Sequence, residues 1–191
     1  WVTCDEEGTQ AVFVADLDTS KAKQRYYSLY YWSDNQKSAE VLADTLTPGL
    51  PKKWLISENG RLFFSKDGKR LFLGTAPVPM PEDTTMNDEE TAKLDVWNWQ
   101  DPNLQPQQLK NLDTEKKRSY SALVHLKKKK FVQLATVSMP NVTVGLEGNA
   151  DVAVGSTDVP YRQLVSWDAA YHDLYLVDAT SGTAKKIAEK T

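Results

Sequence analysis

Short apolar runs alternate with turn-forming residues along this chain, a pattern typical of strands joined by hairpins. The clearest example spans residues 61–74 and reads RLFFSKDGKRLFLG. Apolar runs at 62–64 and 71–73 flank Asp67 and Gly68. Asp-Gly favours a tight turn because glycine adopts a positive φ at little steric cost. The stretch therefore predicts a β-hairpin whose strands are buried on more than one face.

The same arrangement of two successive hairpins occurs three times. In each copy an acidic residue and a glycine form the first turn, at 7–8, 67–68 and 147–148. Three four-stranded units whose apolar faces need covering by a neighbour are typical of β-propeller blades. The sequence predicts an all-β fold of about three four-stranded antiparallel blades, a fragment of a larger propeller, with one long insertion. A β-sandwich with long loops is the alternative, but it does not require the repeat.

The repeats divide the chain into units at about 1–47, 52–137 and 141–191, with the insertion at 75–119 inside the second unit. The insertion begins with alternating prolines, which favour extended chain. Residues 94–99 alternate in polarity and predict a strand with Trp97 and Trp99 on one face. Weak helical character follows Pro106. An insertion of this size is expected on a face or edge, where it can contact a partner.

Composition narrows the class of protein. The chain has 191 residues, is 40% hydrophobic and 26% charged, and carries a net charge of -3. It is therefore globular, and its charge gives no reason to expect nucleic acid as a partner. Cys4 is the single cysteine, which excludes an internal disulfide and a multi-cysteine metal site. No stretch is apolar enough for a membrane span, and no basic-then-apolar signal pattern is found at the N-terminus. Both ends are expected to be cuts within a larger protein, or the ends of a mature or trimmed chain.

No catalytic, metal or cofactor motif is found. The Gly-x-Ser-x-Gly pattern of α/β-hydrolases is absent, and Ser156, in GSTDV, is expected in a turn. His125 is expected to pack within a strand and His172 to be a polar edge residue, because no metal-binding spacing surrounds either. The lysine run at 127–130 is expected to be a solvated hairpin tip. We therefore assign no catalytic residue, no metal ligand and no cofactor.

The six tryptophans are the least ordinary feature of the composition. Exposed aromatic side chains on a propeller face often bind peptide or sugar. Trp97 and Trp99, in the insertion, are the candidate contacts to a substrate or partner. The alternative role for each is packing between blades.

Several stretches resemble one family. FFSKDGKRLFLG resembles a hairpin of the propellers in S9 serine peptidases (prolyl oligopeptidase and dipeptidyl peptidase IV-like), although TolB-like propellers share it. LDVWNWQDPNLQPQQ and VPYRQLVSWDAAYHDLYLVDATSG resemble the N-terminal propeller of large S9 peptidases from Bacteroidetes-type bacteria.

The resemblance implies a propeller that gates peptide access to a C-terminal α/β-hydrolase domain of the same protein, in the periplasm or secreted. The catalytic set of such peptidases lies in the hydrolase domain, so no catalytic residue is carried over. Glu89 and Glu90 are a weak match to the glutamate pair that anchors the substrate amine in dipeptidyl peptidases, because NDEETAKLD does not reproduce the family motif.

Two functions are left open by the sequence. One is the non-catalytic, substrate-gating propeller of an S9 peptidase, and the other is a free-standing TolB-like propeller that binds a protein or ligand. A third, less favoured function is carbohydrate processing by a propeller with two paired catalytic carboxylates, but the sequence does not identify such a pair.

Overall fold

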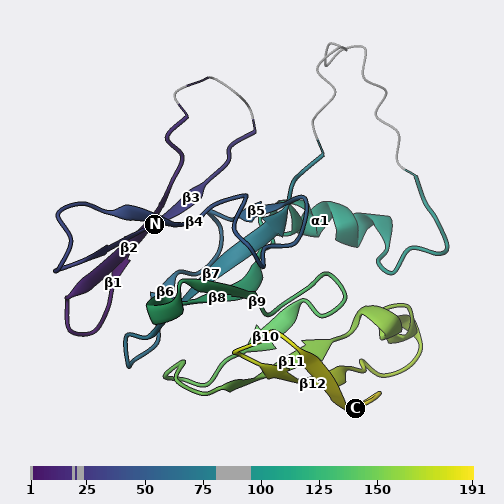
Figure 1. The fold of residues 1–191 in the computed structure, drawn as a ribbon. Helices are drawn as coiled ribbons and strands as arrows, with labels where there is room; N and C mark the ends of the chain where they lie inside the picture. The colour runs from purple at the N-terminus through teal and green to yellow at the C-terminus, as the bar shows by residue number, and fades with distance from the viewer. Residues whose placement is uncertain (1, 19, 21–23, 81–95) are drawn as a thin grey trace.

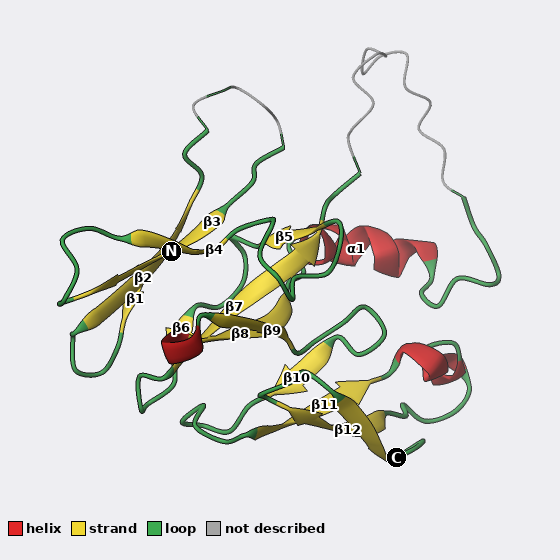
Figure 2. Cartoon of the chain, in the orientation of Figure 1, coloured by secondary structure: helices red, strands yellow, loops and turns green. Residues whose placement is uncertain are grey.

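The computed structural model describes residues 2–18, 20, 24–80 and 96–191. Its strands form antiparallel sheets that follow one another along the chain, here called the first, central and third sheets (Figures 1 and 2). The first sheet contains β1 (Val2–Cys4), β2 (Gln10–Ala15), β3 (Ser28–Ser33) and β4 (Glu40–Ala43). The strands pair in chain order, so the sheet is a simple meander.

The central and third sheets have the same connectivity. The central sheet contains β5 (Trp54–Ile56), β6 (Phe63–Phe64), β7 (Arg70–Pro77), β8 (Tyr120–His125) and β9 (Lys130–Gln133). β5 and β6 pair with successive parts of β7, so together they form one interrupted first strand. The third sheet contains β10 (Asn141–Thr143), β11 (Val152–Thr157), β12 (Asp173–Asp178) and β13 (Ala184–Ala188).

In the described residues, helical structure is limited to short pieces between strands. They are α1 (Gln105–Lys116) and the 3₁₀ turns η1 (Leu126–Lys128), η2 (Val159–Tyr161) and η3 (Leu164–Ser166). No helix in the described ranges has the length and apolar character to cross a membrane.

The hairpin predicted at 61–74 is present and joins β6 to β7. The N–H of Ser65 donates to the carbonyl of Arg70 at 2.8 Å, and Gly68 has φ of +64°. The Asp67 carboxylate accepts hydrogen bonds from the Ser65 hydroxyl at 2.7 Å and the Lys69 N–H at 3.1 Å. The aspartate and the glycine thus fix the turn as the sequence predicts.

Matching turns open the first and third sheets. Gly8 and Gly148 also have positive φ, of +72° and +68°. In all three turns the glycine N–H donates to the carbonyl three residues earlier, over 2.9–3.3 Å. The sequence repeat is therefore a repeat of backbone geometry.

The central sheet is buried on both of its faces, because successive side chains of a strand point to opposite sides. Its buried apolar residues toward the first sheet are Ile56, Leu71, Leu73, Ala122, Val124 and Phe131. Those toward the third sheet are Phe72, Leu123, Val132 and Leu134. The first sheet contributes Val12 and Leu29 to one core, and the third sheet contributes Ala153 and Val177 to the other. Four-stranded meanders packed face to face in series are β-propeller blades, so the predicted all-β propeller architecture is confirmed.

Polar contacts also join the sheets at their hairpin turns. The Gln10 side chain donates to the carbonyl of Gly68 at 3.2 Å, between the first and central sheets. The Lys66 N–H donates to the carbonyl of Glu147 at 2.8 Å, and Arg70 pairs with Asp151, between the central and third sheets. The neighbouring turns are thus connected in series.

The lysine hairpin at 127–130 is present but is more than a solvated tip. Its two strands are joined through η1, and Lys129 has φ of +48°. Lys129 pairs with Glu40 of the first sheet at 2.6 Å, and Lys130 donates to the carbonyl of Thr180 of the third sheet at 2.7 Å. This hairpin therefore contacts both neighbouring sheets.

Some local expectations are wrong. Within the predicted strand at 94–99, residues 96–98 have no regular structure and residues 99–100 form a turn, while residues 94 and 95 lie outside the described residues. Ser156 lies in β11, paired with Asn141 and Leu174, and not in a turn. The alternation at 94–99 was misleading because these residues have no partner strand to pair with in the described part of the chain. The helix expected after Pro106 is present as α1.

Candidate functional site

The long connections of the three sheets lie at equivalent places. In each described sheet the second and third strands are joined by a long segment, at 16–27, 78–119 and 158–172, whereas the first and second strands are joined by a short hairpin. In a meander the second-to-third connections all lie at one end of the strands, opposite the hairpin turns. Figure 1 shows the described parts of these segments on the upper and right-hand sides of the molecule. One end of the fold therefore carries the long connecting segments, and the other end carries the short hairpin turns.

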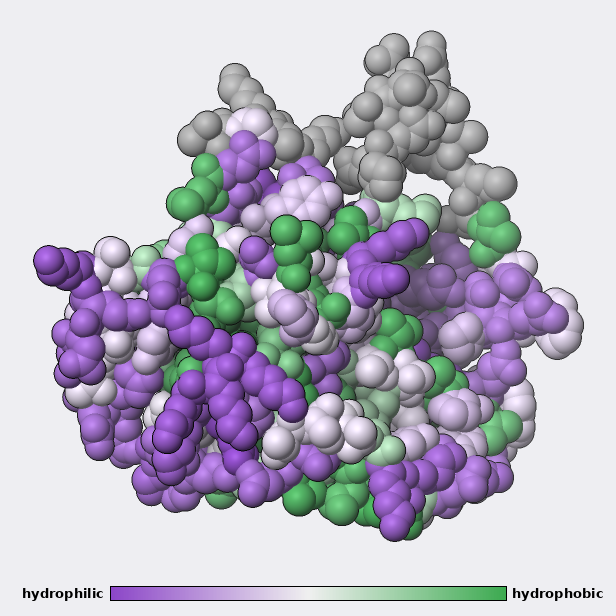
Figure 3. Space-filling view, viewed as in Figure 1, coloured by the Kyte–Doolittle hydropathy of each residue, from purple (hydrophilic) through white to green (hydrophobic). Residues whose placement is uncertain are grey.

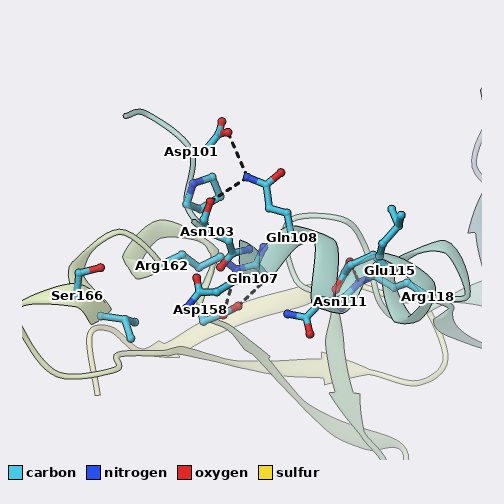
Figure 4. A pocket seen from close by; sticks show the side chains of 13 residues that line it. Asp101, Asn103, Gln107, Gln108, Asn111, Glu115, Arg118, Asp158, Arg162 and Ser166 are labelled. Carbon is cyan, nitrogen blue, oxygen red and sulfur yellow. Dashed lines mark hydrogen bonds and ion pairs between the residues drawn. The ribbon is translucent and has the colours of Figure 1, made fainter. Parts of the chain in front are cut away.

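A cleft of about 690 Å³ opens between two of these connections (Figure 4). One wall is α1 with the loop before it, and the other is the segment with η2 and η3. The side chain of Gln163 donates to the carbonyl of Gln100 at 2.6 Å and joins the two walls. The lining residues are Asp101, Pro102, Asn103, Gln107, Gln108, Asn111, Leu112, Glu115, Arg118, Asp158, Arg162, Val165 and Ser166.

The helix wall is fixed at its N-terminus by carboxamide side chains. Pro106 in the first turn is tolerated because the first N–H groups of a helix have no intrahelical acceptor. Gln107 accepts a hydrogen bond from the N–H of Leu104 at 3.1 Å. Gln108 donates to the Asp101 carboxylate at 3.2 Å and to the carbonyl of Asn103 at 2.9 Å. None of the residues of α1, all within the described ranges, is buried, so the polar side chains of the helix are open to a ligand.

The opposite wall is fixed to the third sheet. Asp173, at the start of β12, is almost fully buried and accepts hydrogen bonds from the Tyr161 hydroxyl and the Lys186 ammonium, both at 2.7 Å. These bonds, and one from the N–H of Lys190 at 3.1 Å, lower the pKa of Asp173 to about 2. Tyr161 belongs to η2, so Asp173 fastens this wall to the sheet.

Two ion pairs face the cleft, one on each wall. Arg162 binds Asp158 through two hydrogen bonds of 3.0 Å, and Arg118 pairs with Glu115. The hydrogen bond from Arg162 lowers the pKa of Asp158, and that from Arg118 lowers the pKa of Glu115. The charges of these two pairs are therefore balanced, and the cleft also presents amide groups and the carboxylate of Asp101, which is hydrogen-bonded to Gln108. Such a lining suits a polar ligand without high net charge better than a strongly charged one.

Exposed tryptophans lie next to cleft residues along the sequence. Trp97 and Trp99 are 65% and 87% exposed, and Trp99 precedes Gln100, which joins the walls. Trp167 is 73% exposed and follows Ser166, which lines the cleft. The structure thus places both predicted tryptophans at the surface, in the loop that leads into α1. Their contact with a ligand stays a prediction.

The two histidines are not among the residues that line this cleft. Glu89 and Glu90 lie outside the described residues. His125 lies at the end of β8, with Nε2 at 3.1 Å from the carbonyl of Ala179, and His172 exchanges backbone hydrogen bonds with Thr191. Among the residues that the structure describes, no three His, Cys, Asp or Glu side chains are grouped to hold a metal ion.

Sequence reasoning missed the polar lining of the cleft. Asn111 and Arg162 come from segments far apart in the chain, in the insertion and in the third unit. The amide-rich stretch NLQPQQLKN was a signal for the helix wall, but nothing in the sequence placed it opposite residues 158–166.

Comparison with known proteins gives similarity of fold only. No family model matches the chain, and no curated protein matches it. The β-propeller domain of the trilobed protease from Pyrococcus furiosus aligns with a TM-score of 0.47 at 10% identity, over 100% of this chain and 43% of that chain. A prolyl endopeptidase aligns with a TM-score of 0.46 at 9% identity, over 100% of this chain and 22% of that chain. TolB from Acinetobacter baumannii aligns with a TM-score of 0.38 at 12% identity, over 98% of this chain and 32% of that chain.

These similarities do not separate a peptidase from a TolB protein. The chain spans less than half the length of each of the three structures. With scores below 0.5, they carry no inference about activity.

Proposed function

We propose that this chain is a non-catalytic β-propeller module that binds extended polypeptide at the cleft between α1 and the η2–η3 segment. The observation that carries the proposal is the clustering of long second-to-third connections at one end of the fold, where two of these connections border a polar cleft and carry exposed tryptophans. Loops on a rigid scaffold are where binding residues concentrate.

The chemistry of the cleft supports a peptide as ligand. An extended peptide has alternating N–H and C=O groups that need partners. Gln107 and Asn111 offer both donors and acceptors, and Gln108 offers its carboxamide oxygen as an acceptor. Tryptophans supply apolar contact area for side chains at low entropic cost. Trp97 and Trp99 are the residues we propose to contact the peptide.

In the finer form of the proposal, the module gates substrates of an S9-type serine peptidase. The hydrolase domain of the same protein would perform acyl transfer through a seryl intermediate, and the propeller would restrict entry to short or unfolded peptides. Such a protein would be periplasmic or secreted. The sequence resemblance described above supports this form.

Peptide binding is tested by titrating the chain with an unstructured peptide pool and following tryptophan fluorescence. Trp99→Ala is expected to weaken binding by roughly 5-fold or more, because a stacked aromatic contributes on the order of 1 kcal/mol. Leu146→Ala, in the hairpin turn at the opposite end, is the matched control and should bind as the parent does. Equal affinity for all three proteins, or no binding by the parent, contradicts the proposed site.

The peptidase form is tested in the source cells with an antibody to this chain. A band several times larger than 21.5 kDa that is labelled by a fluorophosphonate probe is the expected result. An unlabelled band near 21.5 kDa instead supports the alternative, a TolB-like binding module. The exposed tryptophans are consistent with that alternative as well, since their contact with a partner needs no hydrolase domain.

A further inference from the structure

A second cavity, of about 310 Å³, opens between the central and third sheets, beside their first strands. It is here called the inner pocket, and it lies between Arg61 and Phe63 of the central sheet and Val142 and Val144 of the third. It shares no lining residue with the cleft described above. Figure 3 shows polar and apolar residues mixed over the middle of the molecule, where Figure 1 places the central sheet and β10. Small-molecule pockets measure roughly 300–1,000 Å³, so the inner pocket has room for a small ligand.

The inner pocket exists because small residues replace large ones in one layer of the core. Register pairs Phe72 with Leu123 and, two residues further along β7, Gly74 with Ser121. All four lie on the face toward the third sheet, since residues two apart in a strand point to the same side. Phe72 and Leu123 fill that layer, whereas Gly74 and Ser121 leave space in it.

Arg61 lies in the break between β5 and β6. A close approach of two glycines holds this break against β7, since a Cβ on Gly60 would lie 2.3 Å from the Cα of Gly74. The Arg61 guanidinium lies over the ring of Phe63, 4.7 Å from its centroid. Such stacking covers one face of the guanidinium and leaves its N–H groups free to donate at the edge. Among the described residues Arg61 forms no ion pair, unlike the two arginines of the cleft.

Three hydroxyl groups line the same pocket, those of Ser119, Ser121 and Thr143. In the described part of the chain, none of these hydroxyls is hydrogen-bonded to another protein group. Other parts of the wall are apolar and include the stacked rings of Phe63 and Phe72, whose centroids are 4.7 Å apart. The inner pocket thus combines one cation and several hydroxyls, all without a described partner, with an apolar wall.

We propose that the inner pocket binds a carboxylate attached to a small apolar group, such as an aromatic ring. The guanidinium of Arg61 can form two parallel hydrogen bonds with a carboxylate, and the hydroxyls can donate to its remaining lone pairs. Phe72, Val142 and Val144 would remove the apolar group from water. A single cation beside an apolar wall suits a monoanion better than a doubly charged phosphate, whose desolvation would be poorly offset. The proposal does not depend on peptide binding at the cleft.

Binding is tested by NMR titration of the isotope-labelled chain with N-acetyl-phenylalanine, and with the corresponding amide as the matched uncharged ligand. Phenylpropionate has the same ring and a carboxylate but no peptide group, so it separates a free apolar acid from a peptide C-terminus. Arg61→Gln removes the cation, and Ser121→Leu fills the pocket while keeping Arg61. Arg25→Gln, in the long connection of the first sheet, is the control variant. Circular dichroism checks that each variant is folded.

N-acetyl-phenylalanine is expected to shift the amide signals of Gly74, Ser119 and Ser121 in a saturable way. The uncharged amide should bind about 10-fold more weakly or less, because hydrogen bonds to charged groups are among the stronger ones. Arg61→Gln should weaken binding of the acid to the same extent, Ser121→Leu should abolish it, and Arg25→Gln should leave it unchanged. Phenylpropionate that binds as well as the acid assigns the pocket to free apolar acids, and clearly weaker binding assigns it to peptide C-termini.

Several results would overturn the proposal. They are equal affinity for the acid and the amide, unchanged affinity of Arg61→Gln or Ser121→Leu, and no shift of the parent at millimolar ligand. Shifts confined to residues of the cleft, such as Gln108 and Asn111, would also overturn it, while leaving the proposed function of the cleft untouched.

Discussion

Replacing Leu123 by alanine should destabilise the contact between the central and third sheets. Leu123 is completely buried in β8, in the cluster that includes Phe72, Val132 and Val177. The substitution removes three carbon atoms, which costs about 2.4 kcal/mol at about 0.8 kcal/mol per buried methylene. The cavity left behind adds to this, so the total is expected to be about 3–4 kcal/mol.

The assay is urea unfolding followed by tryptophan fluorescence, at a protein concentration low enough for single chains. Leu146→Ala is the control, since Leu146 is fully exposed in the turn before β11, and its effect should lie within about 0.5 kcal/mol. A loss below about 1 kcal/mol for Leu123→Ala would mean that the two sheets do not share a packed core, and the series stacking would be refuted.

The remaining predictions concern a buried carboxylate, a close backbone approach and a surface ion pair. Because the folded-state pKa of Asp173 is lowered to about 2, its stabilising contribution is complete above the unfolded-state value of about 3.9 and is lost as the pH falls toward 2. Asp173→Asn should therefore flatten the pH dependence of the unfolding free energy between pH about 4 and about 2, measured by urea titration. Gly74→Ala would place a methyl group 2.4 Å from the Cα of Gly60 and should lower the free energy of unfolding by about 1–3 kcal/mol, measured by thermal unfolding. An unchanged Tm would contradict this prediction. Lys129→Gln should lower the unfolding free energy only slightly, and the difference from the parent should shrink at high salt because salt screens exposed charges. A salt-independent effect would show that the pair with Glu40 is not its source.

The parts of the fold that could be predicted from the sequence depend on local chemistry. Gly68 and its counterparts Gly8 and Gly148 mark the turns because each adopts a positive φ that other residues rarely take. The apolar run at 71–73 indicated burial on both faces, and Leu71, Phe72 and Leu73 are indeed buried toward alternate neighbours.

The parts that could not be predicted depend on contacts between distant segments. Ser156, within GSTDV, was expected in a turn, yet pairing with β10 and β12 keeps it in a strand. The role of Lys129 could not be predicted because Glu40 is 89 positions away. The cleft likewise depends on how the insertion and the η2–η3 segment are placed. The sequence drew attention to the insertion and to Trp97 and Trp99 within it, but not to the cleft that it forms with residues 158–166.

The separation between the two ends of the strands has a consequence for how such a chain can change over time. The hairpin turns are joined to one another through Gln10, Lys66 and Arg70, so an added residue there would disturb two neighbours at once. The connection between β7 and β8 can lengthen at a cost that grows only slowly with loop length. Its 78–119 segment shows how much extra chain one such position already accommodates. New binding specificities can therefore be acquired at that end by insertion, while the packed sheets beneath still need the same buried apolar residues.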